Sequence, residues 1–152
     1  MNDQKELAVD QYWRRCLALD PVLKPSLSTP KPDVTIGWNS EVFPFVRASK
    51  NLRAFQCPVA STNNISWPLF TVEVKGEGGS LRVAKLQNLH NAAIMLSNLR
   101  ELMKAALKEA DFFNKIHPIS LQVTTETVQL SYYWAARSED GQVSYYGNVL
   151  AA

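Results

Sequence analysis

The sequence is poor in cysteine and histidine, with two of each among its 152 residues. Cys16 and Cys57 are too few for a disulfide framework, and the absence of a CxxC pair argues against a cysteine-rich zinc site. We expect both thiols to be free, reduced and buried, as in an intracellular protein.

Long hydrophobic runs are also missing. No apolar stretch approaches the length that a bilayer requires, and the opening residues, MNDQKELAVDQYWRR, lack the apolar segment of a secretory signal. We therefore expect a protein that does not enter the membrane and that is located in the cytoplasm or the nucleus.

An excess of one charge is absent as well. Sixteen basic and fourteen acidic residues give a formal net charge of +2, which neither requires nor excludes a nucleic-acid partner. Hydrophobic residues make up 46% of the chain, enough to bury a core. The length predicts a single domain over residues 1–152, alone or as part of a larger chain.

The first half of the chain is the harder half to assign. Apolar residues recur at helical spacing over residues 3–19, and Pro21 follows, so a helix is expected there. A proline-rich connector over 21–32 leads to a short strand with β-branched residues at 33–38. A short helix over 46–55 is one interpretation of the next stretch.

The second half has clearer patterning. It contains an apolar strand, a glycine-rich turn, a long helix with a broad apolar face, and three strands that begin with a hairpin. In that order, we expect the strands and the helix at residues 68–76, 81–110, 118–124, 127–137 and 142–150. This order predicts an α/β or α+β fold, in which a mixed β-sheet is flanked by helices and a long helix follows the second strand.

Charged residues interrupt the apolar strand at 68–76. Glu73 and Lys75 project from the same face, because residues two apart on a strand do so. Asp33 opens the preceding strand, so pairing of the two strands would place Asp33 opposite Glu73. Adjacent carboxylates repel one another, and a bound Mg²⁺ relieves that repulsion. The ion would polarise a phosphate, while Lys75 would stabilise the developing negative charge.

A plainer interpretation stays open for each motif. An ExK sequence on one strand face is commonly a solvated cross-strand pair, and an aspartate after proline is commonly a turn residue. The combination favours a site, because the acid opens one strand, ExK closes the next, and a helix follows directly.

The long helix carries a polar patch in its first half. Gln87, His90 and Asn91 share one face, with Lys85 and Asn88 to one side. This patch is able to contact a phosphate or a metal-bound water, or it is simply the solvated part of the helix. His90 alone is more often a surface or packed histidine than a ligand.

Three segments together carry a family resemblance: KPDVTIGW, PLFTVEVKGEGG and AKLQNLHNAAIML. They resemble the PD-(D/E)xK nuclease superfamily over about residues 29–146 and, more narrowly, a group of uncharacterised fungal PD-(D/E)xK-like domains. The resemblance implies a restriction-endonuclease-like α/β core. Asp33 matches the first acid of the motif, Glu73 the second acid and Lys75 the lysine.

On the helix, Gln87 matches the glutamine of the exonuclease-like branch of that superfamily. The tyrosine that follows this glutamine in that branch has no counterpart here, which puts the role of Gln87 in question. Asp33 and Glu73 are also far apart in sequence, so an insertion must be looped out between their strands. Glu6 is a candidate for the extra acid that some members place on their first helix.

The resemblance implies an enzyme, a Mg²⁺- or Mn²⁺-dependent nuclease that hydrolyses phosphodiester bonds, with DNA as the expected partner. Asp33, Glu73 and the Val74 carbonyl would bind the metal, and Lys75 and Gln87 would complete the catalytic set. The alternative is a nuclease-like domain with little or no turnover that acts as a nucleic-acid or protein-binding module.

Overall fold

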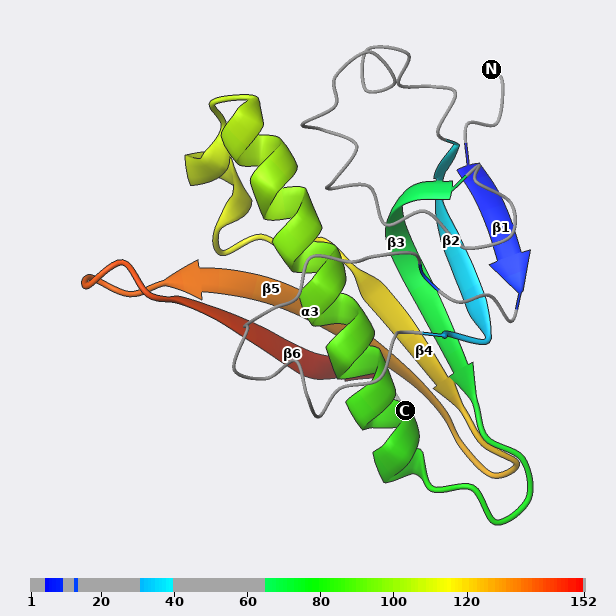
Figure 1. Cartoon of the computed structure of the whole chain (residues 1–152). Coiled ribbons are helices and arrows are strands. Elements are labelled where there is room, and N and C mark those ends of the chain that lie inside the picture. The colour runs from blue at the N-terminus through cyan, green and yellow to red at the C-terminus, as the bar shows by residue number, and fades with distance from the viewer. Residues whose placement is uncertain (1–4, 10–12, 14–30, 40–64, 152) are drawn as a thin grey trace.

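The computed structural model describes residues 5–9, 13, 31–39 and 65–151 (Figure 1). These residues form six strands, one long helix and one short 3-10 helix. In chain order they are β1 (Lys5–Val9), β2 (Val34–Asn39), β3 (Ile65–Val74), α3 (Leu81–Ala105), η2 (Glu109–Phe112), β4 (Ile119–Val123), β5 (Val128–Arg137) and β6 (Val143–Ala151).

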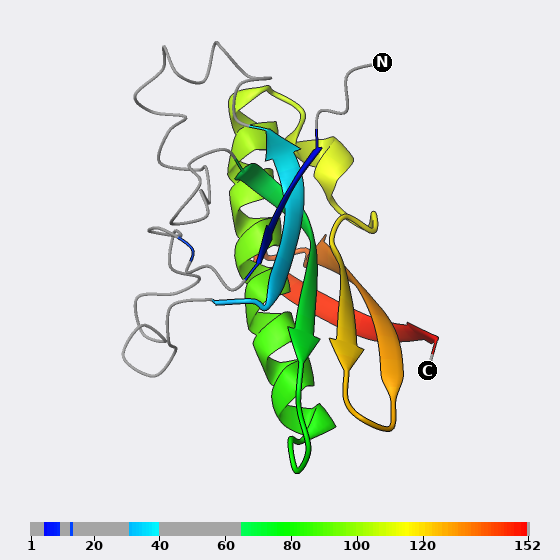
Figure 2. The same ribbon diagram turned by 90° about the vertical axis from the view of Figure 1, so that its right-hand side faces the viewer.

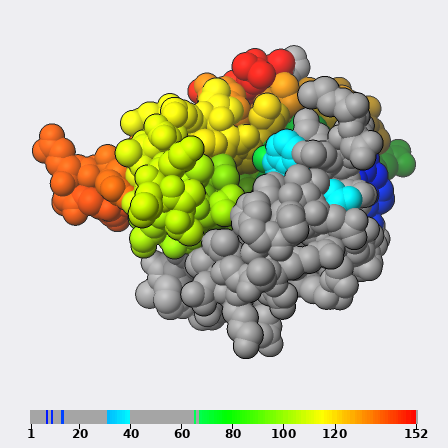
Figure 3. Space-filling view, turned by 90° about the horizontal axis from the view of Figure 1, so that it is seen from above, coloured from blue at the N-terminus to red at the C-terminus, as the bar shows by residue number. Residues whose placement is uncertain are grey.

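The six strands form one mixed sheet, in the order β1-β2-β3-β4-β5-β6. Neighbouring strands are antiparallel except β3 and β4, which are parallel. The parallel pair needs a crossover, and α3 makes it by returning the chain along one face of the sheet (Figure 2). Seen from above, the turn between β5 and β6 projects from one end of the molecule (Figure 3).

The α/β class and the mixed sheet are as predicted, and most elements of the second half lie close to their expected bounds. The long helix ends earlier than expected, at Ala105, and η2 follows it. Within the described part of the chain, no helix is long and apolar enough to cross a membrane. The predicted helix at 46–55 and both cysteines lie outside the described residues.

The prediction of a helix over residues 3–19 is wrong over 5–9. These residues form β1, which pairs antiparallel with β2 so that Leu7 lies opposite Ile36. A short pattern of apolar residues fits either a helix or a strand, and here pairing with β2 decides between them. Residues 14–19 of the predicted helix are outside the described part.

Apolar packing is concentrated beneath the second half of α3. The helix contributes buried residues between Ala92 and Leu96, and the sheet and η2 contribute large side chains. The buried cluster contains Trp13, Ile65, Ala92, Ile94, Met95, Leu96, Phe112, Tyr133 and Ala135. This cluster anchors α3 on the sheet and leaves the first half of the helix to a different set of contacts.

Gly37 marks a close approach between β2 and β3. A Cβ at this position would lie 2.6 Å from Cγ2 of Ile65 and 3.0 Å from Cα of Pro68. We expect Gly37→Ala to lower the free energy of unfolding by about 1–3 kcal/mol, because the two strands must move apart to admit the methyl group. Urea denaturation measures the change. Gly76→Ala is the control, since a Cβ there meets nothing within 4 Å, and equal stability of the two variants would contradict the prediction.

Candidate functional site

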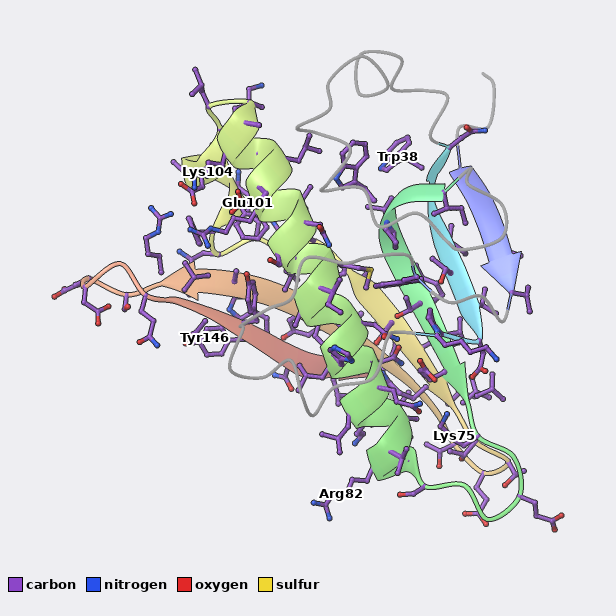
Figure 4. The ribbon with its side chains drawn as sticks, viewed as in Figure 1. Trp38, Lys75, Arg82, Glu101, Lys104 and Tyr146 are labelled. Atoms are coloured by element: carbon purple, nitrogen blue, oxygen red, sulfur yellow. The ribbon has the colours of Figure 1, made fainter. Side chains whose placement is uncertain are left out.

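The charged residues singled out in the sequence meet where β3 ends and the chain turns toward α3. Val34 pairs with Val72, so the register continues to Asp33 opposite Glu73. Asp33 and Glu73 therefore lie on the same face of the sheet, the face that α3 covers. Figure 4 shows Lys75 at this end of β3, at the same end of the molecule as Arg82 in the first turn of α3.

Glu73 is a buried carboxylate, with only 2% of the residue exposed. Its Oε1 accepts a hydrogen bond from Nδ2 of Asn91 at 2.9 Å, and its Oε2 lies 3.4 Å from Nζ of Lys75. Burial raises the pKa of Glu73 above its ordinary value, and the charge of Asp33 acts in the same direction, while Asn91 and Lys75 oppose them. The carboxylate is thus held in a place where its negative charge is poorly solvated.

Asp33 is bound to the backbone of β3. Its Oδ2 accepts a hydrogen bond from the Val74 N–H at 2.5 Å. The N–H and the C=O of one strand residue point to the same side of the strand. In regular strand geometry the Val74 carbonyl points to that same side, so our prediction that it joins Asp33 as a ligand remains a prediction.

Lys75 is the cation of the cluster. Its side chain is 20% exposed and forms an ion pair with Glu73. Its backbone N–H donates to the Val123 carbonyl at 2.8 Å, which extends the parallel pairing of β3 and β4 by one residue. The ammonium group is therefore attached to a fixed backbone and lies beside the Glu73 carboxylate, partly exposed to solvent.

The contact that we expected of Gln87 is made by Asn91 instead. The Gln87 side chain is exposed, whereas Asn88 and Asn91 are buried and face the sheet. Asn88 accepts a hydrogen bond from the Thr71 hydroxyl at 2.9 Å and donates to the Leu121 carbonyl at 3.0 Å. The rotation of α3 explains the difference, because its buried side is set by the apolar cluster farther along the helix.

The two other candidates are His90, on α3, and Glu6, on β1. His90 is half-buried, and burial lowers its pKa, but the described residues give it no contact with Glu73 or Asp33. Glu6 lies in a strand, opposite Gly37, and not on the helix that the resemblance would place it on.

The sheet beneath the first half of α3 is polar. Cross-strand register arranges its buried side chains in two rows, one that continues from Glu73 and one that continues from Thr71. The rows contain Thr35, Thr71, Glu73, Ser120, Gln122, Gln129 and Ser131. Several of these side chains form hydrogen bonds with one another. Ser131 donates to Gln122 at 3.1 Å, and Gln122 donates to Ser120 at 2.9 Å.

The oxygen donors of this cluster fit a hard divalent cation. Asp33 and Glu73 supply carboxylates and Val74 a carbonyl, and Mg²⁺ is commonly bound by one or two carboxylates with water in its other positions. The described residues contain no group of three or more acids, histidines or cysteines that would form a closed metal cage. The donor set therefore fits an open site, whose remaining ligands would be water or substrate.

Asn91 is the residue that the sequence interpretation undervalued. Its signal was present, because Asn88 and Asn91 occupy the same helical stripe as the buried residues Ala84, Ala92 and Met95. A polar residue in an apolar stripe needs a buried partner. That partner was not identifiable before the helix was placed on the sheet.

A family model described as "Domain of unknown function (DUF7924)" matches residues 4–151, which is nearly the whole chain. No curated protein matches the sequence, and no solved structure matches the fold.

Proposed function

We propose that this chain, which belongs to the DUF7924 family, is a metal-dependent nuclease that hydrolyses phosphodiester bonds in DNA. The observation that carries the proposal is the placement of Asp33 opposite buried Glu73, which pairs with Lys75 at the end of β3. A protein gains nothing in stability from burying one carboxylate beside another, so a ligand that needs both is the simplest reason for the arrangement.

In the proposed reaction, Asp33, Glu73 and the Val74 carbonyl would hold Mg²⁺ or Mn²⁺, which would supply Lewis-acid activation of the phosphate and of water. The Lys75 ammonium stabilises the charge that develops on the phosphate or orients the attacking water. The same ammonium forms an ion pair with Glu73.

The order of the elements supports the proposal. β2 and β3 are antiparallel neighbours, and α3 connects β3 to the parallel strand β4. Asp33 precedes β2, Glu73 lies at the end of β3 and Lys75 follows it. This is the order that we would expect if the chain carried the motif of the PD-(D/E)xK superfamily. We propose that core for this chain on the strength of the motif and its placement together.

A cleavage assay tests the proposal directly. Supercoiled plasmid and single-stranded DNA are incubated with the purified chain in Mn²⁺, in Mg²⁺ and in EDTA. We expect cleavage in the metal buffers and none in EDTA. A parallel RNA substrate distinguishes the two nucleic acids. Intact substrates under all conditions, at enzyme concentrations that saturate them, would contradict nuclease activity.

A second candidate function has its own support, in the face of the sheet opposite α3. There the paired side chains are apolar in successive rows, and no helix of the described residues covers them (Figure 2). The row that contains Val74, Val123 and Val128 is partly exposed. An open apolar face favours a protein-binding module. A melting temperature that Mn²⁺ leaves unchanged would favour this module over the enzyme.

A further inference from the structure

We propose that Asn91 is a positioning residue that fixes the Glu73 carboxylate in the orientation that a divalent ion requires. The inference rests on the proposed function, because it assigns Asn91 a role in that same site. Asn91 is not a ligand here: its amide nitrogen donates to Glu73 and acts only through that carboxylate.

The contact divides the two oxygens of Glu73 between different partners. Asn91 holds Oε1 at 2.9 Å, and Oε2 faces Lys75 at 3.4 Å. Both Asn91 and Glu73 are 2% exposed, so water does not compete for the hydrogen bond. A glutamate side chain has several rotatable bonds, and a buried amide on one oxygen removes most of that freedom. Oε2 is left to face Lys75, and the charge of Asp33 is near enough to act on the same carboxyl.

Asn88, one helical turn before Asn91, fixes the position of the helix that carries Asn91. Asn88 accepts a hydrogen bond from the Thr71 hydroxyl and donates one to the Leu121 carbonyl. These two bonds join α3 to both β3 and β4. The helix therefore cannot shift along the sheet without breaking these bonds. Residues that support a metal ligand in this way commonly change metal affinity by about 10–100-fold when they are replaced.

Asn98 provides a comparison for a buried asparagine that has only a structural role. Asn98 lies two turns later on the same side of α3, is 1% exposed, and its Nδ2 donates to the carbonyl of Ile94 in its own helix at 2.9 Å. It matches Asn91 in residue type, burial and helix face but does not contact Glu73. Asn98 is therefore the matched control.

The test is Mn²⁺ binding, followed by the electron paramagnetic resonance signal of the free ion. We compare the wild-type chain with Asn91→Leu and Asn98→Leu, two substitutions of nearly equal shape that remove the amide. We expect Asn91→Leu to weaken Mn²⁺ binding by about tenfold or more, and Asn98→Leu to leave it within about twofold of the wild type. Equal affinities of the wild type and Asn91→Leu would overturn the inference.

A second variant and one further measurement keep the test decisive. Asn91→Ala removes the amide without adding a branched side chain, and the melting temperature in EDTA reports whether each variant folds. Weaker binding in a folded Asn91 variant supports positioning, whereas equal losses in the Asn91 and Asn98 variants overturn it. If the wild-type chain itself binds no Mn²⁺, the proposed function fails, which is a different result from unchanged affinity in Asn91→Leu.

Discussion

Glu73→Gln will abolish metal-dependent cleavage and leave the fold intact. The glutamine keeps the shape of the side chain and an oxygen that accepts from Asn91, but it removes the charge that would bind the cation. Metal catalysis supplies several kcal/mol of transition-state stabilisation, so we expect the cleavage rate to fall by at least about a thousandfold. Initial rates on plasmid DNA in Mn²⁺ measure the effect.

Stability should move little in the same variant. Burial raises the pKa of Glu73, which means that its ionised form is disfavoured in the folded protein. Removing the charge relieves that penalty and also breaks the ion pair with Lys75, so we expect the free energy of unfolding without metal to change by about 1 kcal/mol or less. Glu77→Gln, at an exposed position in the following turn, is the control. Undiminished cleavage by Glu73→Gln would end the nuclease hypothesis.

Lys75→Met will slow cleavage by about 100- to 1,000-fold while Mn²⁺ still binds. A cation that acts on charge developing in the transition state contributes to the rate more than to the binding of the ground state. The ammonium is also a positive charge 3.4 Å from a proposed ligand oxygen. Its removal should leave Mn²⁺ affinity unchanged or slightly higher. Single-turnover rates and Mn²⁺ titrations, measured on the same preparations, separate the two effects.

Lys85→Met is the matched control, because Lys85 is an exposed lysine on the adjacent helix. It removes the same charge from the chain and so accounts for any general weakening of DNA binding. Two results would contradict the role of Lys75. Unchanged cleavage would mean that Lys75 only forms an ion pair with Glu73. A loss of Mn²⁺ affinity equal to the loss of rate would mean that Lys75 maintains the metal site and does not act in the reaction.

Local patterns were sufficient for most of the second half of the chain. Alternating apolar residues, the turn before α3 and the long apolar stripe of the helix are short-range signals, and β3, α3, β4, β5 and β6 follow them closely. The shared face of Glu73 and Lys75 follows from strand geometry alone. β1 was missed because its pattern is too short to distinguish a strand from a helix without its partner β2.

The sequence by itself determined the chemistry offered by the site: two carboxylates and a lysine, in strands whose order places them at one end of the sheet. Only the tertiary structure decided which helix residue meets Glu73. Gln87 and Asn91 are one turn apart, and the choice between them depends on how α3 is rotated on the sheet. That rotation is set by the packing of distant side chains such as Leu96 and Phe112, because a helix turns its most apolar side toward the core whatever its polar residues could otherwise reach.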